Sequence, residues 1–123
     1  LKDSKEKQEA KQIEKKKTLE ELVQTALEFL IEKGEKEASG IILSIPGTRN
    51  KARLYFGPVD KRKGARWHYT VGVYKEGTDL MVSHYLKSGS REEVYEYIKT
   101  DNNRTQTIAS IKHLSDNVDE KWS

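Results

Sequence analysis

The residues that could carry out chemistry are few and scattered. The chain has three histidines (His68, His84 and His113) and no cysteine, so it offers no thiolate ligand, disulfide or cysteine nucleophile. No two of the histidines have the spacing of a metal site. Ser83 and His84 are neighbours on an expected strand, where they point to opposite faces and cannot cooperate. No Gly-rich phosphate loop is present. We therefore predict no enzyme activity, no metal, no cofactor and no small-molecule substrate.

Positive charge, by contrast, is concentrated in one part of the chain. Residues 45–75 hold eight Lys and Arg residues and one acidic residue, Asp60. This segment carries a net charge of +7, whereas the other residues, with 15 basic and 19 acidic side chains, carry −4. The total of +3 conceals this asymmetry, which favours an acidic partner such as nucleic acid or an acidic protein surface.

The clearest structural pattern lies at residues 65–86 and predicts a β-hairpin. Apolar residues occupy odd positions in the first arm and even positions in the second, as in half-buried strands. The residues predicted to point inward are Trp67, Tyr69, Val71, Val73, Leu80, Val82, His84 and Leu86. A two-residue turn at Glu76-Gly77 would pair Val73 with Leu80, and a four-residue loop, 76–79, is the alternative. The opposite face is polar, basic and aromatic, and we expect it to remain open.

Helix-capping residues and chain-breaking residues indicate where the other helices and strands begin and end. Thr18-x-x-Glu21 and Ser90-x-x-Glu93 are capping boxes, each followed by a predicted helix, and the first helix should end at Gly34. Strands are expected at 40–45 and around 52–56, the second broken by Gly57-Pro58. A last short helix is expected at 104–115, after a break at 101–103. Residues 1–17 are interpreted as a charged tail or frayed helix, residues 18–115 as a single domain, and residues 116–123 as a C-terminal tail.

This order predicts a two-layer α+β fold. Four successive strands with short connections favour an antiparallel meander, covered on one face by the N-terminal helix and two short C-terminal helices. The order of elements is similar to that of double-stranded-RNA-binding domains, which have three strands, and to that of sheet-based single-strand binders. No motif of either class is present, so the resemblance assigns no role to any residue.

The open sheet face and its adjoining loops form the predicted binding site. Cations that follow phosphates and rings that stack on bases are typical of single-strand binding. The predicted site residues are Arg49, Lys51, Arg53, Tyr55, Lys61, Arg62, Lys63, Arg66, His68, Tyr74 and Tyr85. The alternative is a protein-interaction module, such as an adaptor, inhibitor or homodimer, that uses the same face. No apolar run is long enough for a membrane span, and a cytoplasmic location is expected.

Overall fold

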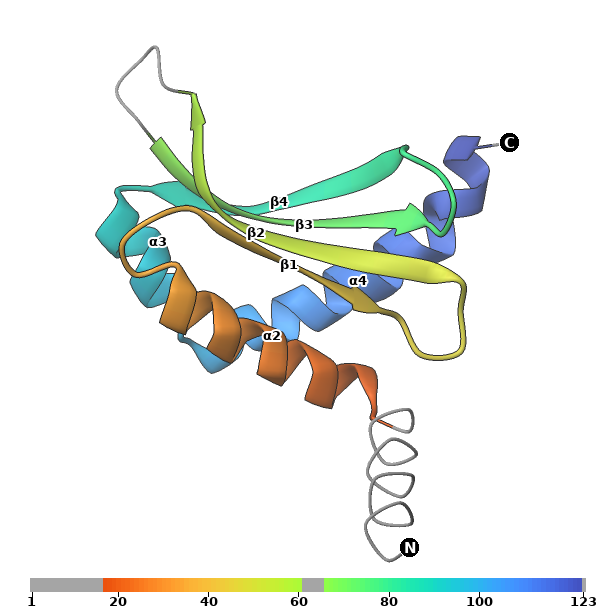
Figure 1. Ribbon diagram of the computed structural model, residues 1–123, viewed down its shortest axis with the longest axis horizontal. Coiled ribbons are helices and arrows are strands. Elements are labelled where there is room, and N and C mark those ends of the chain that lie inside the picture. Colours follow the sequence, from red (N-terminus) through yellow and green to blue (C-terminus); the bar gives the residue numbers. More distant parts are fainter. Residues whose placement is uncertain (1–16, 61–65, 123) are drawn as a thin grey trace, which may run out of the picture.

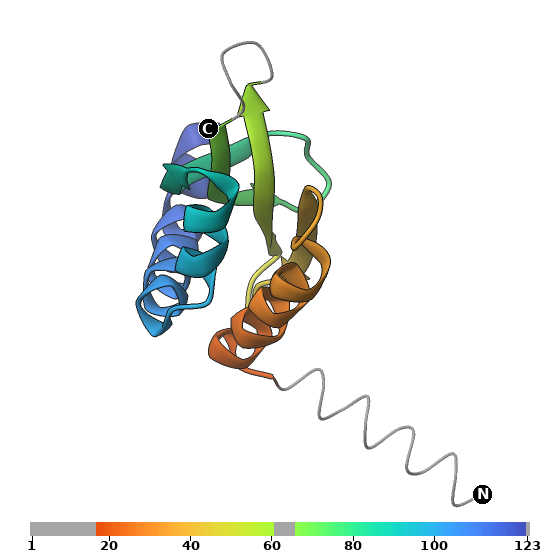
Figure 2. The same cartoon turned by 90° about the vertical axis from the view of Figure 1, so that its left-hand side faces the viewer.

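The fold is a four-stranded antiparallel sheet with three helices on one of its faces. The computed structural model describes residues 17–60 and 66–122, so the predicted tail at 1–17 lies almost wholly outside the described residues. The elements are α2 (Leu19–Lys33), β1 (Ser39–Ser44), β2 (Asn50–Asp60), β3 (Arg66–Lys75), β4 (Met81–Gly89), α3 (Arg91–Ile98) and α4 (Asp101–Trp122). The strands lie in the order β1-β2-β3-β4, and the helices all pack below the sheet (Figure 1, Figure 2). The predicted α+β meander, covered on one face, is confirmed.

Both predicted capping boxes begin helices. The Thr18 hydroxyl accepts a hydrogen bond from the Glu21 N–H at 3.3 Å and donates to the Glu21 carboxylate at 3.2 Å. Ser90 makes the same pair of contacts with Glu93 at the start of α3. These contacts satisfy backbone groups that the first turn leaves unpaired. Gly34 ends α2, and its N–H donates to the Leu30 carbonyl at 2.7 Å.

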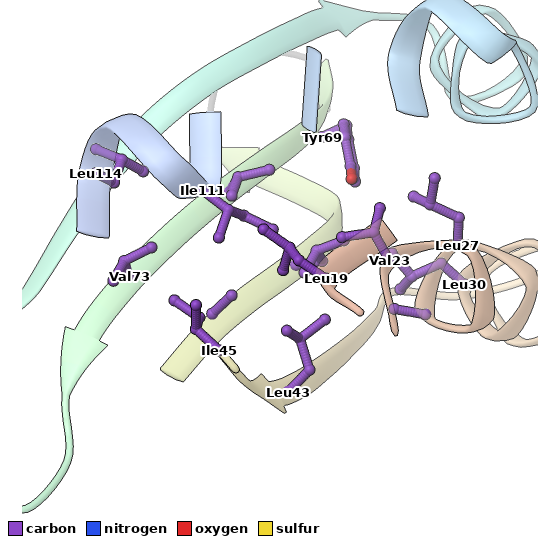
Figure 3. Packing of buried hydrophobic residues seen from close by; sticks show 14 of the residues in the cluster. Leu19, Val23, Leu27, Leu30, Leu43, Ile45, Tyr69, Val73, Ile111 and Leu114 are labelled. Atoms are coloured by element: carbon purple, nitrogen blue, oxygen red, sulfur yellow. The ribbon is translucent and has the colours of Figure 1, made fainter. Parts of the chain in front are cut away.

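The core lies between the helices and the lower face of the sheet. The apolar stripe of α2 packs against inward side chains of β1 and β2, and α4 covers β3 and β4 (Figure 3). The largest buried side chains are Tyr69, Phe56, Leu30, Leu54, Ile98 and Ile111. Phe56 lies 5.0 Å from the Trp67 ring and 6.3 Å from the Tyr95 ring, centroid to centroid.

One polar contact crosses this core. The buried Tyr69 hydroxyl lies 3.0 Å from the Thr107 hydroxyl of α4, which is also buried. Burial raises the pKa of the Tyr69 phenol well above its ordinary value, although hydrogen bonds from Thr107 and Asn103 oppose the shift. A buried hydroxyl without a partner is costly, so this contact fixes α4 relative to β3.

The raised pKa predicts a loss of stability in alkali. Above about pH 10 a tyrosine in the unfolded chain ionises while Tyr69 in the folded protein stays neutral, so folding stability falls by about 1.4 kcal/mol per pH unit from this group. Tyr69→Phe should cost about 1–3 kcal/mol at neutral pH, because Thr107 loses its partner. Urea denaturation of both proteins should show this difference shrinking above pH 10. A difference that stays constant with pH would contradict the assignment.

Strands β3 and β4 form the predicted hairpin, with the pairing expected for the four-residue loop. Val73 pairs with Val82 and Val71 with His84, so the two-residue turn that would pair Val73 with Leu80 is wrong. Leu80 lies outside the strand and is 52% exposed. The pairing between β3 and β4 shifts by one residue between Tyr69 and Thr70. Leu86 is therefore left unpaired and forms a β-bulge. His84 lies on the helix side but is exposed, so the prediction that it packs in the core is wrong.

The predicted break of β2 at Gly57-Pro58 is wrong, because the strand continues to Asp60. The Ile45 N–H donates to the Asn50 carbonyl, so even-numbered residues of β2 bond toward β1. The last pair of that ladder joins Ser39 to Phe56. Pro58 therefore lies beyond the end of β1, where its missing N–H costs no ladder hydrogen bond.

The last helix is longer than predicted at both ends. The Thr100 hydroxyl accepts a hydrogen bond from the Asn103 N–H at 3.1 Å, so residues 101–103 form the first turn of α4 instead of a break. Asp and Asn are favoured at helix starts as well as in turns, which explains the error. The helix continues to Trp122 through residues interpreted as a tail, and Val118 is fully buried in the core.

Candidate functional site

The upper face of the sheet, which we call the open face, carries most of the predicted site. Residues paired across antiparallel strands share a face, and the register places the side chains in rows. The central row is Ile42, Arg53, Gly72 and Ser83. The flanking rows, each about 7 Å away along the strands, are Gly40, Tyr55, Thr70 and Tyr85, and Ser44, Lys51, Tyr74 and Met81. The described helices all lie on the opposite side of the sheet (Figure 2).

Arg53 lies at the centre of the open face. Its side chain is exposed and borders three shallow hollows: one over Thr70, Gly72 and Met81, one toward Tyr74 and Asp79, and one along β1. The first has a volume of about 230 Å³. No carboxylate among the described residues lies within salt-bridge distance of Arg53. Its guanidinium is therefore available to an anion.

Glycines explain how two larger side chains lie along this surface. A Cβ atom on Gly57 would lie 2.5 Å from the Tyr55 hydroxyl oxygen and 2.7 Å from its Cζ. Likewise, a Cβ on Gly72 would lie 2.5 Å from the Met81 sulfur. The Tyr55 ring therefore lies over Gly57, and the Met81 side chain over Gly72. Because the Tyr55 ring and the Met81 side chain lie along the sheet, this part of the open face is flat enough to receive planar groups.

A second cluster lies at the end of the open face nearest the β2–β3 connection. The His68 and Tyr85 rings meet edge to face, with centroids 4.9 Å apart. Burial raises the pKa of the Tyr85 phenol, and the nearby Arg66 charge opposes the shift, so the phenol remains a neutral donor at physiological pH. His68 Nδ1 is buried, and it has no hydrogen-bond partner among the described residues.

The opposite end of the open face is closer to neutral. Lys51 Nζ lies 3.9 Å from the Glu76 carboxylate, and Asp79 borders the adjacent hollow. Arg49 is exposed in the connection between β1 and β2, at this same end. These acidic residues reduce the positive potential here, and at the other end Arg66 is paired across the strands with Asp60.

The structure thus gathers part of the predicted site. Lys51, Arg53, Tyr55, His68, Tyr74 and Tyr85 share the open face, Arg66 lies beside Tyr85, and Arg49 lies at the margin. The predicted residues Lys61, Arg62 and Lys63 lie outside the described residues. Sequence reasoning did not place Ile42, which is 55% exposed beside Arg53. The continuous apolar run at 41–43 gave no alternation that could have assigned it to a face.

Two other kinds of feature are absent from the described part of the chain. There, no group of three or more His, Asp and Glu side chains could hold a metal ion. No helix described between residues 17 and 122 is long and apolar enough to cross a membrane. The features that stand out are therefore the guanidinium and the rings of the open face.

Together these observations define an α+β protein with a four-stranded antiparallel sheet, helices on one face and a cationic, aromatic surface on the other. Comparison with protein-family models, with curated proteins and with solved structures found no match to this chain. Evidence about its function therefore comes from the geometry of the open face.

Proposed function

We propose that the protein is a non-enzymatic module that binds single-stranded nucleic acid, DNA or RNA, on the open face. The observation that carries this proposal is the position of Arg53. An exposed guanidinium with no carboxylate partner in the described structure lies between two rows that contain tyrosines. A phosphate bound by Arg53 would place the adjoining bases over the hollows on either side of it.

The shape of the face supports a single strand over a duplex. Duplex recognition usually inserts a helix or a ribbon into a groove, whereas unpaired bases stack on exposed rings of a flat sheet. Tyr55 and Tyr85 supply such rings in one row. Binding should favour the half of the face from Arg53 to Arg66, which holds the Tyr55, His68 and Tyr85 rings.

The proposal is tested by titrating a labelled single-stranded oligonucleotide at several salt concentrations. We expect affinity to fall steeply as salt rises, because phosphate contacts release counterions. Tyr85→Ala should weaken binding by about 5- to 150-fold, because a stacked base contributes about 1–3 kcal/mol. Arg66→Ala should weaken binding and also reduce the salt dependence. Absence of oligonucleotide binding at low salt would refute the proposal.

A second candidate function is protein binding through the same face. Ile42 is 55% exposed and Met81 is 40% exposed, and Met, Tyr and Arg are enriched at the centres of protein interfaces. This candidate predicts binding to an acidic protein surface with little dependence on Tyr85 stacking. A duplex or single-stranded oligonucleotide that fails to bind, together with a purified acidic partner that does bind, would favour it over the first.

A further inference from the structure

The free edge of β1 presents unpaired backbone groups. The Ile45 N–H donates to the Asn50 carbonyl at 3.0 Å, so odd-numbered residues of β1 are hydrogen-bonded to β2. The N–H and C=O groups of Gly40, Ile42 and Ser44 must then point away from the sheet. Among the described strands none lies on that side, because β1 is the first strand in the sheet order. This edge could accept another strand.

The two edges of the sheet are not equally protected. Proteins usually block an edge with a bulge, a charge or a proline. The β4 edge has both a bulge at Leu86 and a lysine, Lys87. Strand β1, with the sequence SGIILS, has no charged residue and no proline. Among the described strands, the β4 edge is therefore protected and the β1 edge is not.

Apolar side chains of α2 extend the same surface. Gln24 accepts a hydrogen bond from Arg104 of α4, and Glu20 bonds to Lys112 of the same helix, so this flank of α2 faces α4. Successive residues of a helix are 100° apart, so Leu22 and Phe29 lie on the flank that faces away from α4. This flank is on the β1 side of the molecule, because α2 packs below β1. Phe29 is 37% exposed. Helix α2 lies next to β1 (Figure 2), so this flank adjoins the edge of β1.

We propose that a second copy of this chain pairs with β1 and forms a symmetric dimer. Antiparallel pairing about a two-fold axis at Ile42 would place Ile42 opposite its equivalent and Gly40 opposite Ser44 of the second copy. About six backbone hydrogen bonds would form. No like charges would meet within the strands, because SGIILS contains none.

Charge beyond the strand ends fits this arrangement. Glu35, Lys36 and Glu37 precede β1 with a net charge of −1, whereas Arg49 follows it, and all four are exposed. Antiparallel pairing brings the acidic end of one copy to the basic turn of the other. A parallel arrangement would place the acidic ends together, which is unfavourable. The resulting sheet has the four strands of each copy and joins both open faces into one surface.

The test uses the absence of native cysteine. Ile42→Cys introduces a single thiol, and Cα atoms of a hydrogen-bonded antiparallel pair are about 5.5 Å apart, within reach of a disulfide. Mild oxidation or a short bismaleimide should cross-link this variant rapidly. Leu80→Cys is the matched control, because Leu80 is 52% exposed but lies outside the β1 edge. It should remain uncross-linked under the same conditions.

The oligomeric state of the full chain, measured without nucleic acid by sedimentation velocity, provides a second test. The unmodified protein should sediment as a dimer, Ile42→Lys as a folded monomer, and Leu80→Lys as a dimer. Folding of each variant is checked by circular dichroism. A monomer at all concentrations, or a dimer in which Ile42→Cys cross-links no faster than Leu80→Cys, would overturn the proposal. Neither result would affect the nucleic-acid proposal.

Discussion

Replacing Arg53 by glutamate is expected to weaken binding of a single-stranded oligonucleotide by about 100-fold at low salt. A hydrogen bond to a charged group contributes about 1.5–3 kcal/mol, and the new carboxylate would also repel the phosphate. Arg53 borders all three hollows described on the open face, so a single substitution affects every neighbouring base position. Fluorescence anisotropy with a labelled strand measures the effect.

The matched control is Lys51→Glu, which makes the same change in net charge two residues away on the same strand and face. Lys51 already lies beside Glu76, so its replacement should cost about tenfold or less. Equal losses from both variants would show that binding depends on overall charge alone. Arg53→Ala provides a further check, because removal of one phosphate contact should reduce the slope of log affinity against log salt by about 0.7.

The second large effect concerns the fold. Phe56→Ala should lower the free energy of unfolding by about 3–5 kcal/mol, because the ring is fully buried against Trp67 and Tyr95. A small domain has about 5–15 kcal/mol in total, so the urea midpoint should fall sharply. Gly34 also lies against this ring, since a Cβ atom on Gly34 would lie 2.7 Å from Phe56 Cδ1. The ring therefore occupies a closely packed site.

Tyr85→Ala is the control for this prediction. Tyr85 is 46% exposed on the open face, so its loss should change stability by about 1 kcal/mol or less. This result would also show that a loss of oligonucleotide binding in the same variant is not caused by unfolding. Similar destabilisation by both substitutions would contradict the assignment of Phe56 to the covered face and Tyr85 to the open face.

Much of this fold could be predicted because local signals agreed with the tertiary structure. The alternation of Tyr69, Val71 and Val73 with polar neighbours determined the covered face of β3, and Thr18 and Ser90 marked helix starts. The pairing of β4 could not be decided, because Glu-Gly fits two loop lengths and the bulge at Leu86 has no sequence signature. The break predicted at Pro58 was also wrong, because a proline removes a hydrogen bond from the sheet only where a neighbouring strand extends past it.

The candidate site was harder to predict than the fold. Periodicity assigned Arg53, Tyr55 and His68 to one face, but it could not reveal that Glu76 lies beside Lys51 and reduces the charge at one end. The edge position of β1 followed from the predicted meander, but periodicity could not show which side chains of α2 lie beside that edge. These features arise from contacts between residues far apart in the sequence, for which a single sequence carries no direct signal.

The central claim is that single-stranded nucleic acid lies across the open face near Arg53. Amide NMR shifts, recorded while a single strand of about ten nucleotides is added, test it most directly. The largest changes are expected at Arg53, Tyr55, His68 and Tyr85, with little change in α2 and α4. No change at any strand residue, or changes confined to the helices, would contradict the claim.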